Sequence, residues 1–216
     1  MTRWKVERIP MREFWNQKFE GEAYKYGEQP NVFVKQEAGR IPAHASVLVP
    51  GDGEGRNGAW LAEQGHRVLS VDCSDVGLAK AKDLARRRQV EPHMQTLLAD
   101  VTEWHPEPQA FDAVVVCYLH LPSSQRPGVM AHLLKALKPG GLLLLEAFHP
   151  NQLGLTSGGP KDVDLLYTLQ ALRDDAQGSG VRGRELLGWE GEIDLDEGPF
   201  HQGRAQVTRW IWQAAA

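Results

Sequence analysis

The chain has 216 residues, of which 42% are hydrophobic and 24% charged, and its formal net charge is −4. A chain of this length can form one large domain that buries roughly 70% of its unfolded surface, and its ordinary composition argues against a disordered or fibrous protein. The negative net charge, with no basic run longer than Arg86-Arg87-Arg88, argues against a nucleic-acid partner.

The cysteines and the N-terminus bear on the cellular compartment. Cys73 and Cys117 do not form a Cys-x-x-Cys pair, which argues against a disulfide framework or a zinc ribbon, and we expect no metal. A reducing cytoplasm is the natural compartment. The N-terminus is charged and lacks an apolar signal, and the longest apolar run, Leu142 to Leu145 with its flanks, is too short to span a bilayer. We expect a soluble protein with no membrane partner, either a monomer or a weak homodimer.

Two short helices are predicted ahead of the first strand. Apolar residues recur at helical spacing from Ile9 to Phe19, and a second helix is predicted from Val32 to about Gly39. The loop between them, residues 21 to 31, is rich in Tyr and Gly, and its aromatic rings need a surface, which is either the core or a flat ligand. We expect residues 1–44 to form a helical cap and lid.

From Ser46 onward, strands and helices alternate, and each strand is a nearly continuous apolar run. This pattern is typical of a parallel sheet that is covered on both faces. The predicted strands are 47–49, 68–71, 94–98, 113–117 and 142–148. The first predicted helix covers 56–64. The second is capped by Ser74 or Asp75 and ends in the basic run 86–88. The third is capped by Ser123, has Pro127 in its first turn and is followed by a Lys-Pro-Gly-Gly stop at 138–141.

The alternation ends at His149. A glycine-rich loop from His149 to Asp164 follows, and loops of this length in compact domains usually bind something or move. A helix over 165–176 and an antiparallel hairpin of strands 186–195 and 205–212 close the chain. The sequence thus predicts an α/β fold with a doubly wound, mostly parallel seven-stranded sheet. We expect one domain, 1–216, with a cofactor-binding core at 45–149 and a substrate loop, helix and hairpin at 150–216.

Polar or glycine residues follow every strand of the parallel part, and the carboxyl ends of parallel strands meet at one edge of a sheet. Gly51, Gly53 and Gly55 follow the first strand and precede a helix, as in loops that approach a nucleotide cofactor. Asp72 lies 21 residues after Gly51, the spacing at which an acid meets a ribose in dinucleotide-binding folds. Capping of the next helix is the alternative role for Asp72, and chain turning is the alternative for Asp100.

These features together resemble the class I S-adenosylmethionine-dependent methyltransferases. The resemblance covers roughly Ala45 to Trp212 and rests on the glycine loop, Asp72, Asp100, the Leu-Lys-Pro-Gly-Gly turn at 137–141 and the terminal hairpin. More narrowly, three short motifs resemble the branch that contains tellurite-resistance and thiopurine methyltransferase-like proteins. They are Gly-Glu-Gly-Arg-Asn at 53–57, Tyr26-Gly27 with Pro30-Asn31, and Tyr-Leu-His-Leu-Pro at 118–122.

The resemblance implies a Rossmann-like domain that binds S-adenosyl-L-methionine and releases S-adenosyl-L-homocysteine. In that family the glycine loop faces the methionine moiety, the strand-two acid holds the ribose and the strand-three acid meets the adenine. The residues predicted to bind the cofactor are Gly51, Asp52, Gly53, Gly55, Asn57, Asp72, Cys73, Ser74, Asp100, Val101, Cys117 and Tyr118. This sequence has Val49 where the family's first strand usually ends in an acid. Asp52 or a backbone carbonyl is expected to contact the amino group of the methionine moiety instead.

Methyl transfer needs mainly alignment of a nucleophile with the activated methyl group and exclusion of water. His149 or His120 could accept a proton from a thiol or hydroxyl substrate, although a lone histidine at a strand end is more often structural. Electron-rich groups favour a cationic sulfonium, which makes Tyr118 a candidate. The residues predicted to meet the substrate are Trp15, Tyr26, Arg56, Glu146, His149 and Lys161, with Arg56 and Lys161 either holding an anionic substrate or simply solvated.

Two other functions use the same glycine loop. An NAD(P)-binding oxidoreductase is disfavoured because the chain lacks a Tyr-x-x-x-Lys pair and carries the terminal hairpin, and a non-catalytic S-adenosylmethionine-binding regulator stays open because of Val49. No Gly-x-Ser-x-Gly or Gly-x4-Gly-Lys-Ser/Thr motif supports a hydrolase or kinase. The sequence therefore predicts a methyltransferase that acts on a small molecule, with a chalcogen oxyanion or a thiol as the candidate acceptor.

Overall fold

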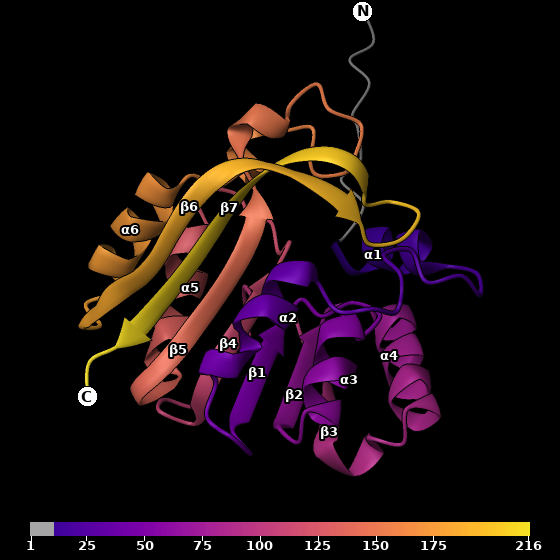
Figure 1. Ribbon diagram of the computed structural model, residues 1–216, viewed down its shortest axis with the longest axis horizontal. Coiled ribbons are helices and arrows are strands. Elements are labelled where there is room, and N and C mark those ends of the chain that lie inside the picture. Colours follow the sequence, from indigo (N-terminus) through magenta and orange to yellow (C-terminus); the bar gives the residue numbers. More distant parts are fainter. Residues whose placement is uncertain (1–10) are drawn as a thin grey trace, which may run out of the picture.

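A computed structural model describes residues 11–216, and its centre is one seven-stranded sheet with the order β3-β2-β1-β4-β5-β7-β6 (Figure 1). Strands β1 to β5 are parallel, whereas β7 runs antiparallel to both β5 and β6. The predicted fold class, a mostly parallel doubly wound sheet with an antiparallel terminal hairpin, is therefore confirmed.

The strands lie where the apolar runs are. Their bounds are β1 Ser46–Pro50, β2 Arg67–Asp72, β3 Met94–Leu98, β4 Phe111–Cys117, β5 Leu137–Phe148, β6 Gly183–Asp196 and β7 Gln202–Ala214. Central strands have apolar side chains on both faces because both faces are covered, and Val47, Leu48 and Val49 are all fully buried. The register pairs Val49 with Ser70 and Asp72 with Leu98, so the strand ends of β1, β2 and β3 lie at the same edge.

Helices cover the two faces of the sheet unequally. α2 Val32–Glu37, α3 Arg56–Glu63 and α4 Asp75–Arg87 pack on one face, and α5 Arg126–Lys135 and α6 Leu169–Gly178 pack on the other (Figure 1). Two separate cores result, one around Val47 and Leu84 and one around Leu48 and Leu134. A third, smaller cluster under the hairpin contains Phe148.

Helix α1, Met11–Phe19, lies against the N-terminal end of α4 rather than against the sheet. The Arg12 guanidinium and the Asn16 amide both donate to Asp75, and the Ser74 hydroxyl donates to the Asn16 side-chain oxygen at 2.6 Å. These contacts hold α1 against the start of α4, at the carboxyl edge of the sheet. The predicted start of this helix at Ile9 and the charged N-terminal segment lie outside the described residues.

Several predicted boundaries differ from the structure. Ser123 does not cap α5, which begins at Arg126 after Gln125; the Ser123 N–H instead donates to Asp164 at 3.2 Å. The last helix begins at Leu169 with Thr168 as its cap, because residues 163–165 form a separate 3-10 turn. The segment 138–141 is part of β5 and not a stop, since the pairing with β4 continues at Leu137 beyond an irregularity.

The remaining predicted boundaries are close to those observed. The second helix ends at Glu37 and continues as a 3-10 turn over Ala38–Arg40, and the hairpin strands are longer at both ends than predicted. Within residues 11–216, no helix combines the length and the apolar character that crossing a membrane requires.

Candidate active site

The glycine loop between β1 and α3 has the backbone conformation that its sequence predicts. Gly51, Gly53 and Gly55 have φ angles of +67°, +57° and +84°, which side chains with a Cβ adopt only at a cost. A Cβ at Gly51 would lie 2.9 Å from Leu119, and one at Gly53 would lie 3.0 Å from the ring of Phe19. The side chains of Leu119, which follows β4, and of Phe19, at the end of α1, therefore pack directly against this loop.

Asp72 ends β2 with a buried carboxylate that faces the glycine loop. One carboxylate oxygen accepts from the Gly53 N–H and the other from the Ser74 N–H, both at 2.8 Å. The capping role belongs to Ser74, whose hydroxyl accepts from the Gly77 N–H at 2.9 Å. Burial raises the pKa of Asp72 above its ordinary value. Each oxygen retains acceptor capacity, so the carboxylate can still accept from ribose hydroxyls.

Other predicted cofactor residues lie at the same edge. Asp100 follows β3, and one of its oxygens accepts from the Thr102 N–H at 2.9 Å and from the Thr102 hydroxyl at 2.8 Å. This contact is the chain-turning role that was the alternative for Asp100. Cys73 lies between Asp72 and the cap of α4, and burial raises the pKa of its thiol to about 12. Val101 packs against the second core, and Cys117 ends β4 with a thiol whose pKa burial also raises.

The Asp52 carboxylate is buried and has hydrogen-bond partners within the protein. Its two oxygens accept from the Ser70 hydroxyl at 2.7 Å and from the Gly58 N–H at 3.3 Å, so the carboxylate is committed to the interface between β2 and α3. A Cβ at Gly58 would lie 2.4 Å from this carboxylate. The expectation that Asp52 replaces the missing acid at Val49 is therefore not supported, which leaves backbone carbonyls for that contact.

Burial raises the pKa of Asp52 to about 7, and this predicts a pH-dependent stability. Because the folded pKa exceeds the ordinary value of 3.8, the contribution of this group is full below pH 3.8 and is lost as pH rises through about 7. Asp52→Asn keeps the shape but cannot ionise. We expect the unfolding free energy of this variant, relative to that of the wild type, to rise by about 1 kcal/mol or more between pH 5 and pH 8 in denaturant titrations. A constant difference over this range would contradict the assignment.

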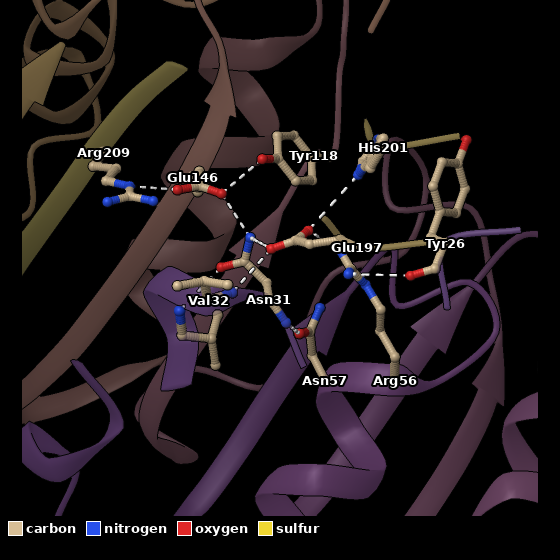
Figure 2. A network of polar contacts seen from close by, with 11 residues as sticks. Tyr26, Asn31, Val32, Arg56, Asn57, Tyr118, Glu146, Glu197, His201 and Arg209 are labelled. Atoms are coloured by element: carbon tan, nitrogen blue, oxygen red, sulfur yellow. Dashed lines mark hydrogen bonds and ion pairs between the residues drawn. The ribbon is translucent and has the colours of Figure 1, made fainter. Parts of the chain in front are cut away.

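A buried network of polar side chains lies beside the glycine loop (Figure 2). Its first centre is Glu146 on β5, which is fully buried. One Glu146 oxygen accepts from the Asn31 amide at 2.6 Å and from the Tyr118 hydroxyl at 2.7 Å, and the other accepts from the Arg209 guanidinium. Burial and the Glu146 charge raise the pKa of Tyr118, so its hydroxyl stays protonated and donates.

The second centre of this network is Glu197, in the turn between β6 and β7. It pairs with the Arg56 guanidinium at 2.8 Å and accepts from the Asn31 amide at 3.1 Å and from the Val32 N–H at 2.9 Å. Asn57 at the start of α3 accepts from the Asn31 N–H at 2.9 Å. Burial opposes ionisation of Glu197, yet contacts with His201 and Arg56 lower its pKa to about 2. The hairpin turn is thereby tied to α2 and α3.

The network changes the interpretation of two predicted substrate residues. Arg56 is buried, pairs with Glu197 and also donates to the Tyr26 carbonyl at 3.2 Å, and Glu146 accepts from Asn31, Tyr118 and Arg209. Neither lines the cavity described below. A direct role for Arg56 in holding an anionic substrate is therefore not supported by this geometry.

A cavity of about 270 Å³ lies between α1, the 149–164 loop and the hairpin turn, and it includes two predicted substrate residues, Tyr26 and Lys161. It is lined by Lys18, Tyr26, Thr156, Gly158, Gly159, Lys161, Pro199, Phe200, His201 and Gln202. Trp15, another predicted substrate residue, lies next to this lining. Its ring stacks on that of Phe19 with 5.4 Å between the centroids, and the Lys18 ammonium lies 5.0 Å from the Trp15 centroid.

The predicted catalytic histidines do not line this cavity. His149 begins a 3-10 turn over Pro150–Gln152, and its Nδ1 accepts from the Asn151 N–H at 3.1 Å. His120 is buried and its Nδ1 lies 2.6 Å from the Leu165 carbonyl, which fixes that nitrogen as the donor. Burial lowers the pKa of His120 to about 4, so it is a weak base. Its Nε2 has no hydrogen-bond partner among the described residues.

Tyr118 connects the cavity to the strand edge. It follows β4 with a φ angle of +52°, and its ring lies 4.6 Å from the ring of His201 and 4.5 Å from that of Phe148. His201 in turn lies 4.6 Å from Tyr26. The cavity therefore borders the end of β4.

Sequence reasoning missed the residues that come together only in the folded chain. They are Lys18, Phe19, Asn31, Glu197, His201 and Arg209. Only Asn31 had a local signal, since it belongs to the Pro30-Asn31 motif and caps α2 by accepting from the Val34 N–H. Glu197 and His201 lie in a turn that meets the glycine loop across more than 140 positions of sequence.

Comparisons with known proteins bear on this arrangement. Residues 47–141 match a family model described as a methyltransferase domain. The chain is 24% identical to a thiopurine S-methyltransferase from Legionella pneumophila, with 93% of this chain and 96% of the relative covered.

Solved structures share the fold. One, described as "Conversion of a Disulfide Bond into a Thioacetal Group during Echinomycin Biosynthesis", has a TM-score of 0.75 at 17% identity and covers 95% of this chain and 92% of its own. A SAM-dependent methyltransferase from Methanosarcina mazei has a TM-score of 0.68 at 16% identity, with 87% and 99% covered. These similarities imply S-adenosylmethionine as cofactor and a small-molecule substrate, and they favour a methyltransferase over the oxidoreductase alternative. Residues 47–141 are a methyltransferase domain, and the similarity over the whole chain supports a class I S-adenosylmethionine-dependent methyltransferase enzyme.

Proposed function

We propose that this enzyme methylates a small sulfur, selenium or tellurium acceptor held in the cavity beside Tyr118. The observation that carries the proposal is the placement of the cavity, which joins the end of β4 through the contacts of His201 with Tyr118 and Tyr26. A volume of about 270 Å³ is at the small end of ligand sites and suits a compact acceptor. The thiopurine S-methyltransferase relatives support a sulfur acceptor.

We propose the strand edge as the cofactor site because its residues fit the group. Asp72 has a buried carboxylate with free acceptor capacity, and the positive φ angles of Gly51 and Gly53 shape the loop beside it. Bound S-adenosylmethionine supplies a methyl group on a positively charged sulfur. Tyr118 presents an electron-rich ring suited to such a cation, and α1 and the 149–164 loop enclose the cavity between them.

The reaction balances without a further co-reactant. The acceptor's lone pair forms the bond to the methyl carbon, and the carbon–sulfur bond breaks with its electron pair retained by sulfur, which yields S-adenosylhomocysteine. An oxyanion or thiolate needs no base, and a thiol releases its proton to solvent or to a neighbouring imidazole. The modest demand for proton transfer agrees with the weak basicity of His120.

A methyl-transfer screen tests this function. The purified full chain is incubated with S-adenosylmethionine and with 2-mercaptoethanol, 3-mercaptopropionate, selenite or tellurite, and S-adenosylhomocysteine release is measured. Catechol and glycine serve as oxygen and nitrogen acceptors. We expect at least one chalcogen acceptor to raise the release well above the acceptor-free rate. Turnover with catechol or glycine alone would contradict the proposal.

A further inference from the structure

We propose that the cavity beside α1 is an anion site, in which Lys18 and Lys161 hold a negatively charged methyl acceptor. This inference rests on the proposed function and narrows its substrate class to small anions that carry a nucleophilic sulfur or selenium atom. Lys18 and His201 join Lys161 as residues that contact the acceptor.

The charge of the cavity lining carries the first step. Among residues 11–216, the lining contains two lysines and a histidine together with neutral residues, and it contains no aspartate or glutamate. The nearest carboxylate of the network, Glu197, is paired with Arg56 at 2.8 Å and so is already neutralised. A small cavity with uncompensated positive charge favours an anionic ligand.

Lys18 carries the second step. Its ammonium lies 5.0 Å from the ring centroid of Trp15 and 5.7 to 5.9 Å from those of Tyr26, Phe14 and Phe200. It forms no ion pair with any carboxylate of residues 11–216, and burial lowers its pKa. Aromatic faces stabilise the cation only in part, so an anion entering the cavity would supply the missing partner.

The 149–164 loop contributes the opposite wall. Gly158 and Gly159 have φ angles of +129° and +85°, and a Cβ at Gly158 would lie 2.8 Å from the Phe200 carbonyl. These glycines let the loop approach the hairpin turn closely enough to bring Lys161 to the cavity. The Lys161 ammonium donates to the Leu155 carbonyl at 3.3 Å, which orients it and leaves two of its three N–H donors for a ligand.

His201 forms the wall that faces Tyr118. It is only 4% exposed, and its Nδ1 has no hydrogen-bond partner in the described part of the chain and lies 3.8 Å from a Glu197 oxygen. Burial lowers its pKa, so the imidazole is neutral near pH 7. A neutral imidazole carries one N–H donor and one lone pair, and it can position either a thiol or an oxyanion next to the methyl group.

Two thiols that differ by one charge test the proposal. 3-Mercaptopropionate carries a carboxylate, whereas 2-mercaptoethanol carries a hydroxyl on a similarly short chain. Each is titrated calorimetrically into the full chain saturated with S-adenosylhomocysteine, and kcat/KM for methylation of each is measured with S-adenosylmethionine. We expect the anionic thiol to bind at least about tenfold more tightly. A parallel titration with selenite shows whether an inorganic oxyanion occupies the same site, since it should then compete with 3-mercaptopropionate.

Variants of the two lysines locate the effect. Lys18→Met and Lys161→Met should each reduce the preference for the anionic thiol by about tenfold, and Lys18→Arg should retain it. Lys25→Met is the matched control, because Lys25 lies 5.9 Å from the same Phe200 ring but does not line the cavity. The affinity for S-adenosylhomocysteine, measured for every variant, reports whether the fold and the cofactor site are intact.

The possible outcomes separate this inference from the proposed function. Equal affinity of the wild type for the two thiols, with S-adenosylhomocysteine bound normally, would overturn the anion site and leave the methyltransferase proposal standing. A preference that survives both Met substitutions would overturn the assignment to Lys18 and Lys161. Absence of S-adenosylhomocysteine binding, or methylation of catechol or glycine only, would overturn the proposed function and this inference with it.

Discussion

Replacing Asp72 by alanine is expected to weaken S-adenosylhomocysteine binding by well over tenfold while the domain stays folded. The carboxylate ends β2 beside the glycine loop, and two backbone N–H groups, those of Gly53 and Ser74, fix it at 2.8 Å. A preorganised charged acceptor can hold both ribose hydroxyls, and hydrogen bonds to a charged group contribute about 1.5–3 kcal/mol each. Calorimetric titration of the variant with S-adenosylhomocysteine measures the loss.

Stability must be measured alongside affinity for this variant. Alanine leaves the N–H groups of Gly53 and Ser74 without their acceptor, which costs about 1–3 kcal/mol, within the stability of an ordinary domain. Asp83→Ala is the control. It removes an exposed aspartate from α4, the helix that follows Asp72, without changing the glycine loop. Unchanged affinity in Asp72→Ala would reduce Asp72 to a residue that only orders the loop.

Replacing Glu197 by alanine is expected to lower the unfolding free energy by about 3–5 kcal/mol, because it leaves the buried Arg56 guanidinium without its counter-charge. The side chains of both residues are almost inaccessible, at 7% and 3% exposed. Denaturant titration of the full chain measures the change. The double variant Arg56→Met/Glu197→Leu removes both charges and should be much less destabilised than Glu197→Ala.

An exposed ion pair on the same hairpin serves as the control for Glu197. Glu192 pairs with Arg204, whose side chain is 70% exposed, and Glu192→Ala should cost no more than about 1 kcal/mol. The pKa of about 2 for Glu197 also predicts that its contribution is full above its ordinary value of 4.5 and is lost as pH falls toward 2. A cost below 1 kcal/mol for Glu197→Ala would show that the network does not fasten the hairpin turn.

The parts of the fold that sequence predicts are those with local causes. Val47, Leu48 and Val49 form a run that only a strand covered on both faces explains, and the glycines after it require positive φ angles. The seven strands and the shared strand edge follow from such runs. The segment 138–141 was misinterpreted because Pro and Gly usually end elements, whereas here β4 continues to pair beyond them.

The orientation of side chains at the site was less predictable. The sequence predicts that both Asp52 and Asp72 contact a cofactor at the glycine loop. The Asp52 carboxylate instead points into the interface between β2 and α3, where it accepts hydrogen bonds from Ser70 and Gly58. Arg56 looked like a free cation, since its partner Glu197 lies 141 residues away. Such pairings depend on how the hairpin turn folds back, which no local pattern encodes.

The long-range contact of the hairpin turn also explains why the sequence predicts only some of the residues that line the cavity. Gly198 has a φ angle of +100°, and a Cβ there would lie 2.3 Å from the Gly27 nitrogen, so the hairpin turn and the Tyr26-Gly27 loop touch backbone to backbone. This contact brings His201 and Phe200 over Tyr26 and Lys18. Tyr26 and Lys161 could be predicted as substrate residues from their loops, whereas no local pattern in the first predicted helix marks Lys18 as a site residue.

Calorimetric titration of the full chain with S-adenosylhomocysteine, and separately with NAD, tests the central claim most directly. The account predicts one S-adenosylhomocysteine site per chain with a micromolar or tighter dissociation constant, which corresponds to about −8 kcal/mol, and no measurable NAD binding. Binding of NAD without binding of S-adenosylhomocysteine would contradict it.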